Sequence, residues 1–557
     1  MKNNWKYVVL VFGVVAGFTS CVQDLNTEPI DKHSATSFNQ DAVFSKCYAT
    51  LATTGQKGPQ GDCDIDDLDE GTSSFYRMMW ELNEFGTDEG WWIWNDVGLA
   101  DIRVMNWNGD NALVKGLYYR LNIDIKICNH FLSYTENATD EKTLQQRAEV
   151  RFIRAFNYWY LLDMFKVIPF NTKESSELPE FKERPELYEW LVAELKELTT
   201  LLPEQRLSIY RVDRYAAWLL LARTYINAEI YTGTPAWNEA LAAAEEALKG
   251  PYALHTNSVM SGDGTIRYSA YQQLFMGDNN RNGAEKEIML LAYQDGVYCQ
   301  SWGGSRFVIN MVRDAGMVPA GSDASWKCFR SSPEFVYKFV SQDQAENIKT
   351  DEYHMPQLLG DDRAIMCSAT DSVNSDRPAT GWELSGNMDA NFYKSWSVLK
   401  FTGVYSTSEN PNKSVSLSGD PSWPDTDLPW LRIAEAYMIK AEALFRTGKT
   451  ADALVVINDV IRKRANAVPL AKLDEATLCD EYCREFYCEG HRRSDLIRFN
   501  RFAGPKADAN SYHWEGRNGQ TSNAGFKSAE EKWNWYPIPN DDKATNTNYK
   551  KTNGDGY

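Results

Sequence analysis

Apolar residues recur every three to four positions over much of the chain, which is the spacing of one face of an α-helix. Between residues 144 and 165 they form a broad stripe bordered by arginine and glutamate, so a helix packed on most of its sides is predicted there. Further helices are predicted over residues 185–202, 211–231 and 238–248, and Gly250-Pro251 ends the last of them. Alanines at close-packed positions favour antiparallel neighbours, as in helical-repeat hairpins, although no strict 34-residue period can be traced.

The same periodicity returns near the C-terminus, with helices predicted over residues 431–444, 451–465 and 475–488. The long stretch between the two helical parts lacks this pattern and is rich in glycine, asparagine and aromatic residues. Long irregular segments on a rigid scaffold are where binding residues usually lie. We therefore predict a mainly α-helical fold with one body over residues 21–557, comprising a helical scaffold at about 30–250 and 428–557 and a loop-rich insertion at about 251–427.

The N-terminus has the pattern of a targeting signal, because two lysines precede an apolar run over residues 7–15. About a dozen apolar residues reach roughly 18 Å as a helix, which is short of the ~30 Å hydrocarbon core of a membrane. We predict that residues 1–20 are a signal peptide. The small residues directly before Cys21 resemble a bacterial lipobox, in which this cysteine becomes the acylated first residue; ordinary secretion is the alternative.

Composition narrows the class of ligand. The formal net charge of −19 argues against a nucleic-acid partner, because phosphate binding needs a basic face. Aromatic residues make up 13% of the chain, with 19 Trp and 29 Tyr, so part of this aromatic content is expected at the surface. Nine cysteines remain after Cys21, which is too few in so long a chain for a disulfide framework. Cys479, Cys483 and Cys488 lie on one predicted helix, but their side chains do not all point to the same side of it. Packing is therefore favoured over zinc binding.

A tryptophan triplet is the most conspicuous local feature. Trp91, Trp92 and Trp94 lie in a stretch, residues 86–96, that is too polar and glycine-rich for a core strand. Folded proteins seldom leave several large rings in water, so the cluster indicates a binding surface. Indole faces beside amide and carboxylate groups suit a sugar, whose CH groups stack on the ring while its hydroxyls meet the polar rim. The alternative is that one or two rings attach a loop to the body, and Trp91 is the ring we assign to packing.

Four segments, in a fixed order, carry a resemblance to a known family. They are residues 146–155 with 165–169, residues 431–444, residues 484–496 with the run Glu489-Gly490-His491-Arg492-Arg493, and the closing Tyr536-Pro537-Ile538-Pro539. Together they resemble the SusD/RagB family of glycan-binding lipoproteins of the Bacteroidetes outer membrane, from Cys21 to the end of the chain. The resemblance implies tetratricopeptide-like helix pairs, a ligand surface made mostly by inserted loops, no catalytic activity and no required cofactor. It also implies a partner, a SusC-like TonB-dependent β-barrel transporter that the protein covers as a lid.

Within the family, the chain looks closest to the starch-binding member. Trp92 and Trp94 look like the paired tryptophans of that member, Trp302 stands where it has a tyrosine, and an asparagine that reads sugar hydroxyls falls on Val97. The resemblance, with Asn95 as the nearer polar group, implies glycan contacts from Trp92, Trp94, Asn95, Trp302 and Trp326. Tryptophan at 302 flattens the expected platform, which favours an extended β-linked glucan over a coiled α-glucan. The predicted ligand is therefore a glucan, either starch-like or β-linked.

The resemblance also implies a calcium site. Asp278, Asp425 and Asp427 lie where the starch-binding member holds calcium, and hard oxygen ligands from two loops suit Ca²⁺. The alternative is that these residues are ordinary turn aspartates. A structural Ca²⁺ is thus possible but not required.

Two other functions compete with glycan capture as explanations of the sequence. A glycoside hydrolase needs two carboxylates flanking the scissile bond, and Asp88 with Glu89 could be nominated. Adjacent residues on an extended loop diverge, however, so no enzyme activity is predicted. The second rival is a lid of the same family that captures a non-glycan nutrient, against which the tryptophan content argues. Arg492, Arg493 and Asp495 are interpreted as an ion-paired helix end rather than a phosphate site.

Overall fold

The computed structural model describes residues 38–55, 58, 63–92, 94, 96–103, 105–313, 321–326, 328–345, 348, 359–368, 396–409, 416–509 and 530–557. Phe44–Tyr557 forms one compact unit. Helices dominate it and the strands are short, which confirms the predicted mainly α-helical fold. Among the described residues, no helix is both long and apolar enough to cross a membrane.

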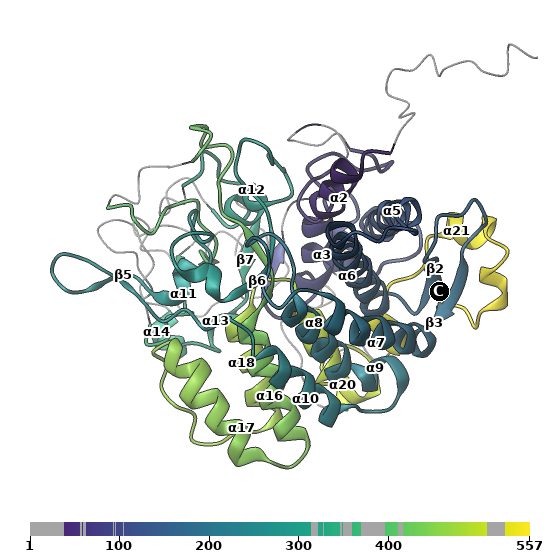
Figure 1. Cartoon of the computed structure of the whole chain (residues 1–557). Helices are drawn as coiled ribbons and strands as arrows, with labels where there is room; N and C mark the ends of the chain where they lie inside the picture. The colour runs from purple at the N-terminus through teal and green to yellow at the C-terminus, as the bar shows by residue number, and fades with distance from the viewer. Residues whose placement is uncertain are drawn as a thin grey trace, which may run out of the picture. The chain divides into compact units, whose positions relative to one another are not determined.

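The N-terminal scaffold is a series of helices that pack on their neighbours in sequence (Figure 1). Its helices are α5 Ala112–Tyr134, α6 Glu141–Met164, α7 Arg184–Leu201, α8 Arg214–Ile226, α9 Ala228–Thr232 and α10 Trp237–Ala247. Side-chain caps start three of them: Asn111 accepts from Val114 N at 3.2 Å, Asp140 from Thr143 N at 2.9 Å, and Asp213 from Tyr215 N at 3.0 Å. The N-terminal helices predicted from periodicity are therefore present, with ends that move by a few residues, except that the single helix predicted over residues 211–231 is divided at Asn227 into α8 and α9.

The C-terminal scaffold closes on the N-terminal one. α16 Ile433–Arg446 packs against both α8 and α10, and the buried alanines of α10 allow this close approach. α17 Thr450–Val456 continues as the π-helical turn Ile457–Arg462, followed by α18 Glu475–Phe486 and α19 Arg492–Arg498. The helix predicted to reach Cys488 ends at Phe486, because Cys488 has a φ of 57° and its N–H donates to Glu89 rather than back into the helix. Contacts between elements far apart in sequence thus join the two halves.

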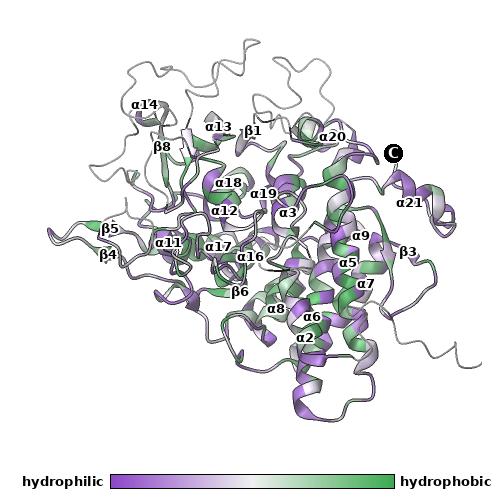
Figure 2. Cartoon of the chain, turned by 90° about the horizontal axis from the view of Figure 1, so that it is seen from above, coloured by the Kyte–Doolittle hydropathy of each residue, from purple (hydrophilic) through white to green (hydrophobic). Residues whose placement is uncertain are grey.

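The other helices among the described residues have ten residues or fewer. They are α2 Gln40–Ala49, α3 Phe75–Glu84, α4 Leu99–Arg103, α11 Ala270–Gln273, α12 Ser305–Asn310, α13 Pro333–Val336, α14 Gln342–Ala345, α20 Pro505–Ala509 and α21 Asn540–Thr545, with 3₁₀ turns at Ala284–Lys286, Glu531–Asn534 and Tyr549–Lys551. Figure 2 shows apolar and polar segments side by side along α5, α6 and α7, as expected for helices that bury one face.

The strands among the described residues are short and pair antiparallel, and two of the pairs connect the insertion to the scaffold. They are β1 Gly90–Trp92, β2 Val167–Phe170, β3 Glu180–Glu183, β4 Val259–Met260, β5 Ile266–Tyr268, β6 Ile288–Ala292, β7 Phe329–Ser331, β8 Met366–Ser368, β9 Trp396–Val398 and β10 Leu428–Arg432. The largest sheet has the order β1-β7-β9-β8, and Gly90 pairs with Ser331 while Trp92 pairs with Phe329. A Cβ on Gly90 would lie 2.2 Å from the Phe329 ring, so this pairing requires glycine. The tryptophan segment is thereby fixed to the insertion.

Buried ion pairs link helices and strands that are far apart in the sequence. Arg432, at the end of β10, contacts Glu287 at 2.7 Å, Glu485 at 3.1 Å and Glu489 at 2.7 Å, and all four side chains are buried. Unpaired buried charges are strongly unfavourable, so each pair fixes the segments that carry it. These contacts tie the insertion to the C-terminal helices.

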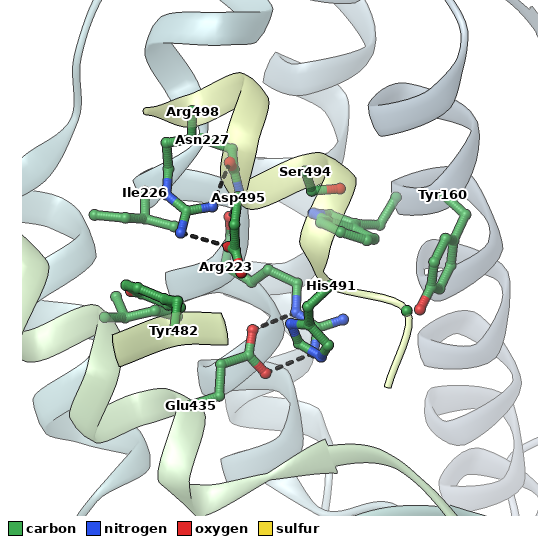
Figure 3. A pocket seen from close by; sticks show the side chains of 13 residues that line it. Tyr160, Arg223, Ile226, Asn227, Glu435, Tyr482, His491, Ser494, Asp495 and Arg498 are labelled. Carbon is green, nitrogen blue, oxygen red and sulfur yellow. Dashed lines mark hydrogen bonds and ion pairs between the residues drawn. The ribbon is translucent and has the colours of Figure 1, made fainter. Parts of the chain in front are cut away.

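A second charged cluster surrounds a cavity of about 20 Å³, which has room for about one water molecule (Figure 3). Arg223 of α8 contacts both carboxylate oxygens of Glu435 of α16, while Arg498 of α19 contacts Asp495 at 2.7 Å. The predicted ion-paired helix end is confirmed, because Arg492 pairs with Asp88 at 2.6 Å and Arg493 lies 3.6 Å from Asp163.

Candidate functional site

A cleft of about 480 Å³ brings together three tryptophans from separate parts of the chain. Trp94 follows β1, Trp302 precedes α12, and Trp326 precedes β7. The pairing of β1 with β7 brings Trp94 and Trp326 together, since Trp92 lies opposite Phe329. The cleft is lined by Asp67, Leu68, Asp69, Gly71, Thr72, Arg77, Trp94, Asp96, Val97, Trp302 and Trp326.

Trp94 is the most exposed of these rings, at 42%. Its centroid lies 6.2 Å from that of Trp326 with an interplanar angle of 34°, so the two rings form neighbouring parts of one surface. Trp92, in contrast, is only 2% exposed and packs against Phe85 at 5.0 Å and Phe307 at 6.1 Å. The expectation that Trp92 offers a face to a sugar is therefore corrected: its ring supports Trp94 from beneath, in an edge contact at 6.1 Å.

Another part of the cleft is built around Trp302. Its ring meets Trp423 edge-on at 5.0 Å, and the Arg306 guanidinium lies 4.7 Å from the Trp302 centroid and 5.3 Å from that of Trp423. Arg306 is itself held by Asp323 at 3.1 Å. Gly303 then allows a close approach to α3, because a Cβ there would lie 2.1 Å from Ser74 Oγ. Trp302 is thus fixed by packing and charge rather than left free to move.

Polar groups form the rim between the rings. Arg77 of α3 donates to Glu81 at 2.8 Å, to Asp96 at 3.2 Å and to the carbonyl of Gly71 at 3.2 Å. Burial raises the pKa of Glu81 to about 7, although the Arg77 charge opposes this, and burial likewise raises the pKa of Asp96. Asp69 also lines the cleft, where one of its oxygens accepts the Thr72 N–H at 2.8 Å. The rim therefore offers both donors and acceptors for hydroxyl groups.

Sequence reasoning missed Asp69 and Arg77 as members of this site. Nothing in the neighbouring sequence distinguishes either residue from a surface charge. Asn95 and Cys21, which the sequence predicts as a glycan contact and as the lipidated residue, lie outside the described residues. The side chain of Trp91 is also outside what is described. Their predicted roles stay predictions.

The three aspartates of the predicted calcium site already have protein donors. Asp278 accepts from Ser406 N at 2.9 Å, Asp425 accepts from the Tyr405 hydroxyl and from Leu417 N, and Asp427 accepts from Gln294 N at 2.6 Å. Asp425 Oδ1 is the one buried oxygen of the three carboxylates without a hydrogen-bond partner. Within the described ranges, no group of three or more His, Cys, Asp or Glu is placed to hold a metal ion. The roles of Asp278, Asp425 and Asp427 as Ca²⁺ ligands therefore stay a prediction.

The carboxylates considered for hydrolysis are structural. Asp88 is buried and paired with Arg492 at 2.6 Å and with Lys338 at 3.1 Å. Glu89 is also buried, accepts the Cys488 N–H at 2.9 Å and shares a hydrogen bond with Glu84. Burial raises the pKa of both glutamates. Neither Asp88 nor Glu89 lines the tryptophan cleft.

The nine cysteines are free thiols, and eight of them are buried. Cys479 and Cys483 lie on α18, and burial raises the pKa of Cys479 to about 11. A neutral buried thiol behaves as a small apolar side chain, as predicted for the C-terminal group.

The fold places the chain among helical-repeat scaffolds that carry a loop-built cleft. The chain belongs to the SusD family: its residues 286–557 match the model of that family. It is 36% identical over 586 aligned residues to the starch-binding protein SusD of Bacteroides thetaiotaomicron, with 99% of each chain covered.

Solved structures agree on the fold. A SusD superfamily protein from Bacteroides thetaiotaomicron matches with a TM-score of 0.64 at 17% identity, covering 91% of this chain and 98% of the other. A surface glycan-binding protein A from the same species, in complex with laminarihexaose, matches with a TM-score of 0.60 at 17% identity, covering 91% and 97%. At these identities the likeness establishes the architecture alone.

Proposed function

We propose that this protein binds a polysaccharide at the bacterial cell surface through the tryptophan-lined cleft. The observation that carries the proposal is the convergence of Trp94, Trp302 and Trp326 on one cleft with Arg77 and Asp69 at its rim. Indole faces accept the CH face of a sugar ring, while guanidinium and carboxylate groups bind its hydroxyls. Because packing already holds the aromatic rings of the cleft in place, little side-chain entropy is lost on binding. This favours affinity for a ligand that has few apolar groups.

The ligand we propose is a glucan, and preferably an extended β-linked one. The name of the 36% identical relative, a starch-binding protein, supports a glucan. The Trp94 and Trp326 rings are neighbours, with centroids 6.2 Å apart, which supports a continuous platform. Affinity electrophoresis tests the linkage: we expect retardation by β-glucans, and retardation by amylose alone would reject the β-linked preference.

The wider role we propose follows from membership of the SusD family. The protein is anchored at the outer membrane through Cys21 and passes its glycan to a SusC-like TonB-dependent transporter, without catalysing a reaction. The engagement of Asp88 and Glu89 in buried contacts supports binding without hydrolysis. Incubation of the protein with the bound glucan should release no reducing ends.

Two cleft variants test the binding site directly. Trp94→Ala and Trp302→Ala should each weaken binding about tenfold or more in isothermal titration, because each removes an aromatic face from the site. Trp237→Ala is the matched control, since this partly buried tryptophan of α10 lies outside the cleft. Normal affinity in both cleft variants would show that the glycan binds elsewhere, and a glycan array without any binding would favour a non-glycan nutrient.

A further inference from the structure

An exposed aromatic turn lies just before Trp302 in the sequence. Tyr298 is 78% exposed, and its neighbour Val297 is 41% exposed. Leu417, on the adjoining loop, is 61% exposed. Apolar groups gathered beside a binding cleft mark an interaction surface more strongly than the same groups scattered singly.

The turn that carries Tyr298 is firmly held. One carboxylate oxygen of the buried Asp295 accepts the N–H groups of Val297 at 2.9 Å, Tyr298 at 2.7 Å and Cys299 at 2.9 Å, while the Tyr293 hydroxyl donates to the other oxygen at 2.6 Å. Although burial raises the pKa of Asp295, these donors outweigh it and lower that pKa, so the carboxylate stays charged at neutral pH. The exposed Tyr298 ring therefore projects from a fixed backbone.

The base of this turn is continuous with the wall of the cleft. Gly296 lies so close to the 416–423 loop that a Cβ there would meet Trp423 O at 2.8 Å and Ser418 Oγ at 2.9 Å. Trp423 packs edge-on against Trp302, which lines the cleft. Tyr298 and Trp302 are four positions apart in the sequence, which is at most about 14 Å of extended chain. Both rings are therefore within reach of one extended oligosaccharide.

We infer that Tyr298 is an outer platform that stacks a further sugar of the glycan held by the tryptophan cleft. This inference rests on the proposed glycan binding and extends it to the length of chain that is recognised. A tyrosine suits the task, because it supplies a large flat face at a small cost in side-chain entropy and a hydroxyl for the polar edge of the sugar. The platform makes affinity rise with oligosaccharide length beyond what the cleft alone can cover.

Titration of wild type and variants with glucan oligosaccharides of increasing length tests the inference. Tyr298→Ala should leave the Kd of the shortest bound oligosaccharides unchanged and weaken that of long ones about tenfold. Tyr298→Phe, which keeps the ring face, should retain most of the length dependence. Tyr134→Ala is the matched control, since this tyrosine is 60% exposed at the end of α5 and lies outside the cleft. Thermal melts should show all three variants to be folded.

The outcomes separate this inference from the proposed function. Equal Kd values for Tyr298→Ala and wild type at every length, with binding still lost in Trp94→Ala, would overturn the outer platform and keep the cleft. Unchanged binding in both Tyr298→Ala and Trp94→Ala would overturn the cleft as well. Equal weakening of short and long oligosaccharides by Tyr298→Ala would also reject the platform, because it would place Tyr298 inside the site. If Tyr298 instead contacts a protein partner, the Kd for long glucans will not change.

Discussion

At the scale of single residues, burial decides which of several similar side chains can act. Trp92 and Trp94 are two positions apart, so an extended strand would present both on one face. β1 ends at Trp92, however, and Trp94 lies beyond the strand; Trp92 is 2% exposed and Trp94 is 42% exposed. Asp88 and Glu89 are close in sequence to the same rings, but buried contacts hold them outside the cleft.

Burial of one carboxylate also makes the stability of the protein depend on pH. Burial raises the pKa of Asp495 to about 6, against the lowering effect of Arg498, while a free aspartate titrates near 4. The folded state therefore holds this proton over a range in which the unfolded state loses it. Its contribution to stability is complete below about pH 4 and is lost as pH rises through about 6, at up to about 1.4 kcal/mol per pH unit.

Asp495→Asn should flatten that part of the pH profile. We expect the free energy of unfolding of wild type to fall relative to that of the variant between pH 4 and pH 6, measured by urea denaturation. Asp263→Asn is the control, because this aspartate is solvent-exposed and its pKa is lowered by hydrogen bonds to Thr265. Parallel profiles for wild type and Asp495→Asn would contradict the raised pKa.

At the scale of elements, the helices follow from local sequence and the strands do not. The stripe of apolar residues and the caps at Asp140 and Asp213 are enough to start and extend α6 and α8. The strand β1 has three residues, and its partner β7 lies more than two hundred positions away. No local sequence pattern therefore predicts that the two strands pair. The predicted helices are largely correct for this reason, while the sheet that positions the site was not predicted.

Gly90→Ala tests how far β1 depends on this pairing. A Cβ there would lie 2.2 Å from the Phe329 ring and 2.5 Å from Arg330 O, so the strands must separate. Overpacking of this kind costs about 1–3 kcal/mol, and the displaced β1 should also weaken glycan binding through Trp94. Chemical denaturation and titration measure the two effects. Gly262→Ala is the control, because nothing lies within 4 Å of a Cβ at that position; equal stability of the two variants would contradict the role of Gly90.

At the scale of the whole molecule, buried ion pairs connect segments that are far apart in the sequence. Arg432 brings together Glu287 of the insertion with Glu485 and Glu489 of the C-terminal part. Arg464 adds a contact to Glu287 at 2.9 Å. The insertion is therefore fixed to the scaffold by groups that would be very unfavourable if left unpaired.

Arg432→Met should destabilise the protein by about 3–5 kcal/mol, because it leaves buried carboxylates without their shared cation. Lys472→Met is the control: Lys472 is 83% exposed, its ion pair with Asp474 is at the surface, and its loss should cost less than about 1 kcal/mol. Urea denaturation at pH 7 compares them. Similar unfolding midpoints would show that the cluster contributes little.

The sequence alone determined most of the helices and the family resemblance. These properties depend on the spacing and type of neighbouring residues, which the chain carries in any conformation. The tertiary structure decided which rings face the cleft, that Arg77 and Asp69 stand at its rim, and that Asp278, Asp425 and Asp427 already have protein donors. Those outcomes depend on contacts between residues tens to hundreds of positions apart, because burial and strand pairing are properties of the folded chain and not of any segment of it.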